Sequence, residues 1–190
     1  MLASIDIRNT ELLKKIKDQF FQNSPILISE TLTGQVVNNG IITLGCMAGQ
    51  HNASIEYLLH EMCHLVEIED DRMTQPNWGL KFGSDIQTIF GTRVQNFKTT
   101  QATHREMRVW AYQQHLHELF GIEKPLLETV SVAKNMNDFC FIRFSLFQGD
   151  EPAALNWVES EVKKMMNTFS LARFSSEWTR KTKILSQVSV

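Results

Sequence analysis

The spacing of apolar residues along the chain predicts a short helix followed by a small sheet. Leu12, Ile16 and Phe20 recur at helical spacing, which predicts a helix over residues 10–21. The segments "PILISE" and "QVVNNGIITLG" have the alternation of short strands, and the Asn-Asn-Gly run inside the second predicts a hairpin turn. We therefore expect a small antiparallel sheet ahead of the next helix.

The rest of the chain is predominantly helical in pattern. Residues 74–83 are rich in turn formers and predict a loop, and residues 139–147 fit either a buried strand or a helix. The basic, polar tail at 170–190 is expected to be only partly ordered. Helices are expected over residues 55–69, 85–97 (whole or in part), 103–120, 126–136 and from Asp150 onward.

The predicted elements, with no recognisable repeat or linker between them, indicate one α+β domain spanning residues 1–190, and the composition is that of a globular protein. The chain is 43% hydrophobic and 21% charged, and its net charge of −2 gives no electrostatic reason to expect nucleic-acid binding. Three widely spaced cysteines do not make a disulfide framework, and no signal sequence or membrane-spanning run is recognisable. We expect a cytoplasmic protein, with non-classical export still open and the oligomeric state unspecified.

The segment "YLLHEMCHLVE" (57–67) contains the motif HExxH. On a helix, His60 and His64 project from adjoining turns of one face, so both imidazoles can bind one cation. Glu61 lies beside the pair, where it can act as a general base without ligating the ion. The apolar residues form a separate arc that excludes both histidines, which would leave them facing a cleft (Ile55, Leu58, Leu59, Met62, Leu65 and Val66).

A catalytic metal site normally has a third protein ligand, and the sequence offers three candidates. Glu106 falls within the apolar stripe of helix 103–120, and a carboxylate facing inward needs a partner because unpaired burial is costly. A cation bound by His60 and His64 would be such a partner. Alternatively, Thr103 and Glu106 match the capping box S/T-x-x-E, so the glutamate would only satisfy backbone N–H groups. His104 and Asp70 are lower-ranked alternatives, and Asp70 stands where metzincins have their third histidine.

Further polar residues are candidates for orienting the ligands. Glu56 and Glu67 lie one turn on either side of the histidines, and His117 lies in line with Glu106 on its helix. The alternative for the two glutamates is that they are ordinary exposed residues of a helix.

Two family resemblances rest on these residues. HExxH followed by a glutamate on a later helix resembles the gluzincin branch of the zincin-like metallopeptidases. More narrowly, "NGIITLG", "HEMCH", "NWGLKFG" and Glu106 resemble the layout of the elongation factor P hydroxylase family. The resemblance covers roughly residues 10 to 115. It implies a zincin-like fold with His60, His64 and Glu106 as metal ligands, and either hydrolysis or oxygen chemistry.

Three functions remain open from the sequence. The first is a zinc metallopeptidase in which Glu61 activates water against a protein or peptide substrate. The second is a non-haem iron hydroxylase, because two histidines and one carboxylate also form the facial triad that binds Fe(II). The third is a non-catalytic binding protein on the same scaffold.

Overall fold

The computed structural model describes residues 5–22, 24–32, 34–38, 41–46, 53–75, 86–89, 92–95, 100–123 and 137–188. The helices are α1 (Thr10–Ile16), α2 (Ile55–Glu67), α3 (Thr100–Phe120), α5 (Asn137–Phe147), α6 (Glu151–Met166) and α7 (Leu171–Val188). Two shorter turns are the π-helical η1 (Lys17–Phe21) and the 3₁₀-helical η2 (Asp70–Arg72). The strands are β1 (Leu27–Ser29), β2 (Gln35–Asn38), β3 (Ile41–Gly45), β4 (Ile86–Ile89) and β5 (Thr92–Gln95). The predicted mostly helical α+β fold is confirmed.

The sheet that precedes α2 has the order β1-β3-β2 and is mixed. β2 and β3 pair antiparallel, as a hairpin requires, and the predicted turn residues 39 and 40 lie outside the described residues. β1 pairs parallel with β3, so the expectation of a purely antiparallel sheet holds only for the hairpin. Gly45 ends β3 where the preceding loop crosses closely: a Cβ there would lie 2.3 Å from the carbonyl oxygen of Leu32.

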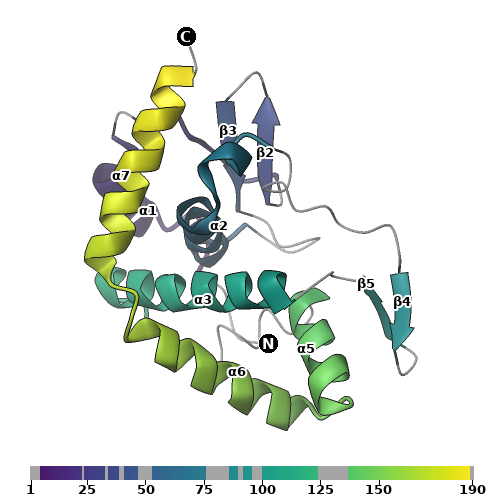
Figure 1. The fold of residues 1–190 in the computed structure, drawn as a ribbon. Helices are drawn as coiled ribbons and strands as arrows, with labels where there is room; N and C mark the ends of the chain where they lie inside the picture. Colours follow the sequence, from purple (N-terminus) through teal and green to yellow (C-terminus); the bar gives the residue numbers. More distant parts are fainter. Residues whose placement is uncertain are drawn as a thin grey trace.

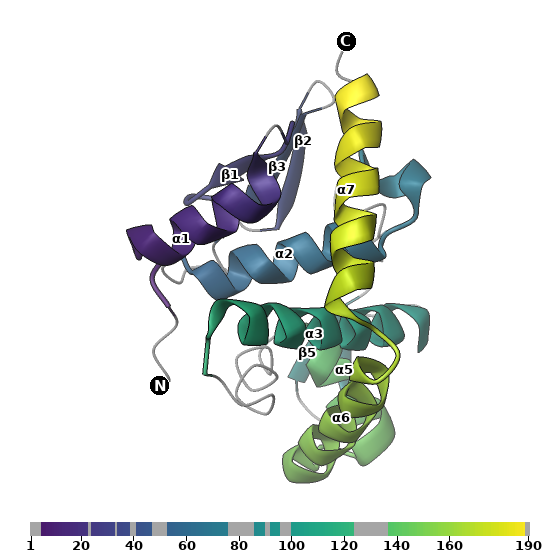
Figure 2. The ribbon, with the colours of Figure 1, turned by 90° about the vertical axis from the view of Figure 1, so that its left-hand side faces the viewer.

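Helix α2 runs through the middle of the molecule (Figure 1). The sheet and α1 lie on one side of it, α3 crosses the other side, and α7 packs alongside (Figure 2). The Ser54 hydroxyl accepts a hydrogen bond from the Glu56 N–H at 3.1 Å and so caps the first turn. The predicted apolar arc is confirmed, since all six of its residues are buried in the main core.

Helix α3 lies between two apolar clusters, which explains why its sequence shows a broad stripe. Val109, Tyr112 and Leu116 pack into the main core with α2 and α7. Met107 and Trp110 face the opposite way, into a second cluster with α5 and α6. This double burial fixes α3 firmly beside α2.

One expected element takes another form, one ambiguous segment is resolved as a helix, and two expected elements fall wholly or largely outside the described residues. The helix expected over 85–97 is wrong: β4 and β5 pair antiparallel there, consistent with the β-branched residues of "IQTI" and "TRVQ". The ambiguous segment 139–147 belongs to helix α5. The helix expected over 126–136 and most of the loop expected over 74–83 lie outside the described residues.

The tail expected to be partly ordered is instead helix α7, and it completes the main core. Phe174, Trp178 and Leu185 are buried against it. The indole N–H of Trp178 donates to the Phe20 carbonyl at 2.7 Å, and the ammonium group of Lys181 donates to the Ile68 carbonyl just beyond α2. No helix in the described ranges is both long and apolar enough to cross a membrane.

Candidate metal centre

The two histidines of HExxH project from adjoining turns of α2 toward α3. Their Nε2 atoms lie 3.1 Å apart, and the two rings are nearly perpendicular, with centroids 4.7 Å apart. Only 5% of His60 and 9% of His64 is exposed. The prediction that they share one face is confirmed, but α3 covers that face, so the imidazoles are buried between two helices rather than lining an open cleft.

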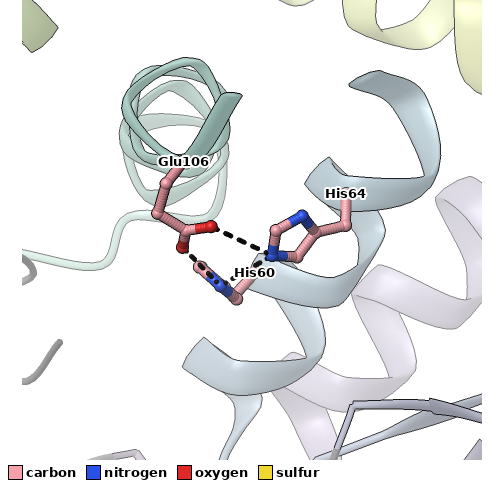
Figure 3. Close-up of side chains that lie close together, drawn as sticks. All are labelled: His60, His64 and Glu106. Carbon is pink, nitrogen blue, oxygen red and sulfur yellow. Dashed lines mark hydrogen bonds and ion pairs between the residues drawn. The ribbon is translucent and has the colours of Figure 1, made fainter. Parts of the chain in front are cut away.

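Glu106 reaches both imidazoles from α3 (Figure 3). Its Oε1 lies 3.0 Å from the Nε2 of His60, and its Oε2 lies 3.5 Å from the Nε2 of His64. The carboxylate is as buried as its partners, at 5% exposed. The three side chains predicted to form a site therefore meet.

The alternative role of Glu106 as a helix cap is excluded by where α3 begins. The helix starts at Thr100, three residues before the expected cap Thr103. A capping glutamate stands at the third helical position, where N–H groups are still unpaired. Glu106 is the seventh residue of α3, beyond the first turn, so no unpaired backbone N–H group at the helix start requires its carboxylate.

The spacing of the donor atoms fits a single transition-metal ion. His60, His64 and Glu106 each offer one ligand atom within 4.8 Å of the others, and all three residues are buried. With bonds of about 2.1 Å, neighbouring ligands lie about 3.4 Å apart around a tetrahedral ion and about 3.0 Å apart around an octahedral one. The two Nε2 atoms are 3.1 Å apart, and the carboxylate places Oε1 3.0 Å from that of His60 and Oε2 3.5 Å from that of His64, so the observed spacing falls in this range. This group could hold a metal ion, and the spacing accommodates zinc or iron.

The charges within the cluster are strongly coupled. Burial lowers the pKa of His60, but the Glu106 carboxylate more than reverses this and raises it to about 9. Burial and the neighbouring His60 lower the pKa of His64 to about 4. Although burial opposes it, the two imidazoles hold the pKa of Glu106 down at about 2. Without a cation, the buried carboxylate is neutralised by one proton on His60.

A glutamine connects the centre to its surroundings. The side-chain oxygen of Gln113 lies 3.1 Å from the Nδ1 of His60, and its amide nitrogen donates to the backbone carbonyl of Glu56 at 3.2 Å. The same nitrogen lies 3.5 Å from the Nε2 of the fully buried His117. His117, a predicted supporting residue, thus lies next to the centre, whereas Gln113, on the same face of the helix, had no role predicted from the sequence.

The other glutamates of α2 have distinct positions. Glu61 is half-buried, and its negative charge contributes, after that of Glu106, to raising the pKa of His60. It is not one of the three ligand residues, as the motif predicted. Glu67 forms an ion pair with Arg108 of α3 instead of contacting the histidines. Glu56 is buried rather than exposed, and its backbone oxygen is the atom that contacts Gln113.

The lower-ranked ligand Asp70 lies outside the centre. Its carboxylate pairs with both terminal nitrogens of Arg180 at 2.6 and 2.8 Å, because η2 turns it toward α7. His104 lies in α3, but its side chain is outside the described part of the structure.

Arginines from α3 and α7 neutralise the acidic end of α2. Arg108 pairs with Glu67, and Arg105 lies 3.2 Å from Glu69. Residues 67–71 include four acidic side chains, whose charge the helix dipole disfavours at that end. Distant helices supply most of the compensating charges, and the local Arg72 adds a pair with Glu69 at 3.7 Å.

Comparisons with known proteins identify no relative. No protein-family model, no curated protein and no solved structure matches the chain.

Proposed function

We propose that this chain is a metal-dependent hydrolase that holds zinc with His60, His64 and Glu106. The observation that carries the proposal is a buried carboxylate facing two imidazole nitrogens at the separations that ligands of one ion adopt. A buried anion between two bases needs a positive charge, and a divalent cation would supply it.

A zinc ion at this position would supply Lewis acidity and lower the pKa of a bound water toward ~7. The protein's own contribution is to fix the donors on two packed helices and to provide a base. Glu61 follows His60 directly and is only half-buried, so it would accept the proton of the attacking water and pass it to the leaving amine. The substrate class that suits this chemistry is a peptide or protein amide. The resemblance of HExxH and Glu106 to gluzincins supports the same assignment.

The proposal is tested with two glutamate variants that separate metal binding from catalysis. Glu106→Gln should lose most of its zinc, because the anionic ligand is replaced by a weak neutral donor. Glu61→Gln should keep one zinc per chain but lose hydrolysis of a mixed peptide pool by about 10²–10⁴-fold. Glu118→Gln, at an exposed position of α3, is the matched control for both. Full zinc occupancy in Glu106→Gln, or unchanged hydrolysis in Glu61→Gln, contradicts the proposal.

A second candidate is a non-haem iron hydroxylase, and the donor set itself favours it. Two histidines and one carboxylate on one side of an ion form the facial triad of Fe(II) oxygenases. The resemblance to elongation factor P hydroxylases points the same way.

Elemental analysis of protein purified without oxygen separates the candidates. One zinc per chain supports the hydrolase, and one iron supports the hydroxylase, in which Glu61→Gln would keep its activity. No metal, together with no affinity for added zinc or Fe(II), would leave the non-catalytic binding protein as the interpretation.

A further inference from the structure

We propose that Gln113 is the positioning residue of the metal centre, because it fixes the His60 ring so that Nε2 and not Nδ1 binds the ion. The inference rests on the proposed metal site and adds a residue that no sequence motif marks.

The orientation of the Gln113 amide is set by the backbone of α2. Its nitrogen lies 3.2 Å from the carbonyl oxygen of Glu56, which can only accept a hydrogen bond. The nitrogen of the amide must therefore point to that carbonyl, and the side-chain oxygen must point the other way. That oxygen is the atom 3.1 Å from the Nδ1 of His60.

The tautomer of His60 follows from this orientation. An amide oxygen only accepts, so the Nδ1 of His60 must carry a hydrogen and donate it. When the ring is neutral, its lone pair is left on Nε2. Nε2 is the atom that faces Glu106 at 3.0 Å and the Nε2 of His64 at 3.1 Å. Gln113 thus presents the correct nitrogen to the ion.

Gln113 is itself held rigidly. Only 5% of it is exposed, and its amide nitrogen also lies 3.5 Å from the Nε2 of His117 on the next turn of α3. In an α-helix, the Glu56 carbonyl is also the acceptor for the backbone N–H of His60. One carbonyl therefore anchors both the ring-orienting amide and the turn that carries the ring.

The same face of α3 supplies both the ligand and its support. Gln113 follows Glu106 by seven residues, two turns later on the same side of the helix. A shift of α3 along α2 would displace the carboxylate and the orienting oxygen together. The role of orienting a ligand thus belongs to Gln113. His117, one of the residues predicted for that role, contacts the Gln113 amide nitrogen.

The test compares Gln113→Leu with Gln114→Leu, the same substitution at the next residue of α3, outside the ligand cluster. Zinc affinity is measured by competition with a chromophoric chelator, and thermal unfolding in excess chelator reports the metal-free fold. Loss of a residue that orients a ligating histidine costs 10–100-fold in metal affinity, so we expect that loss for Gln113→Leu and less than about threefold for Gln114→Leu.

A second measurement on the wild-type protein needs no variant to fold. Two-bond ¹H–¹⁵N spectra of the zinc-loaded protein identify which imidazole nitrogen of His60 carries hydrogen and which binds zinc. Hydrogen on Nδ1 and zinc on Nε2 support the inference, and zinc on Nδ1 overturns it.

The outcomes separate the inference from the proposed function. If the wild-type protein binds no zinc and no Fe(II), the proposed site itself fails and the inference falls with it. If the wild-type protein binds zinc and Gln113→Leu binds it as tightly as Gln114→Leu does, only the role of Gln113 is wrong.

Discussion

Replacing Glu106 with glutamine should remove a strong pH dependence from the stability of the metal-free protein. The variant keeps the size of the side chain and deletes its charge. In the wild-type protein, burial is the largest single influence on the pKa of His60 and lowers it, but the charge and hydrogen bond of Glu106, with contributions from Glu61 and Gln113, together raise it from its ordinary 6.5 to about 9. With Glu106 neutral, burial is the larger remaining influence and keeps His60 unprotonated.

The magnitude and the sign follow from the two pKa values of His60. Between pH 6.5 and 9, the folded protein holds a proton on His60 that the unfolded chain has released, so stability falls as the pH rises. The pKa rise from 6.5 to about 9 corresponds to about 3 kcal/mol. The lowered pKa of Glu106 reflects the same interaction and is not added to it.

Urea unfolding at fixed ionic strength, in excess chelator, measures this effect across pH 6.5 to 9.5. Other groups titrate in this range, but they are common to both proteins and cancel in the difference. The wild-type protein should lose about 3 kcal/mol relative to Glu106→Gln between pH 6.5 and 9. Parallel stability profiles for the two proteins would refute the reasoning, because Glu106 would then not act on His60.

Three further predictions follow from the same structure. Zinc binding at pH 7 should release about one proton, because His60 is charged there and must be neutral to bind; calorimetry in buffers of different ionisation enthalpy counts it. Asp70→Asn breaks the exposed pair with Arg180 and weakens the 3.8 Å contact with the ammonium group of the buried Lys181, so it should cost about 1–2 kcal/mol in urea unfolding and leave zinc content unchanged. Trp178→Ala removes a buried ring and its bond to the Phe20 carbonyl, so it should cost about 3–5 kcal/mol by the same assay.

The three residues of the candidate centre could be predicted because their positions follow helical periodicity. HExxH fixes two histidines on one face by spacing alone, and the apolar stripe of α3 turned Glu106 inward. Ligand and cap could not be separated from sequence, since the answer depends on whether α3 starts at residue 100 or 103. The conformational preferences of the residues near a helix start are too weak to decide between these two start positions.

The errors have equally specific causes. Apolar residues at positions 86, 90, 94 and 97 have helical spacing, but the β-branched residues among and between them favour the observed hairpin of β4 and β5. In α7, the apolar residues 174, 178 and 185 also recur at helical spacing, and the many charges around them hid the pattern. The orienting role of Gln113 was not predicted because no sequence motif marks a side-chain amide. That role depends on which backbone carbonyl the amide contacts.

The packing of α7 against α2 and α3 also sets an order of events during synthesis. Both ligand-bearing helices leave the ribosome before residues 171–188 are made. Until then, the apolar surfaces that Phe174 and Trp178 later cover are bare, and the contact between α2 and α3 lacks the support of the third helix. Because metal affinity is gained only with the folded geometry, the nascent chain would acquire its cation late. Unfinished chains would thus be kept from capturing metal prematurely.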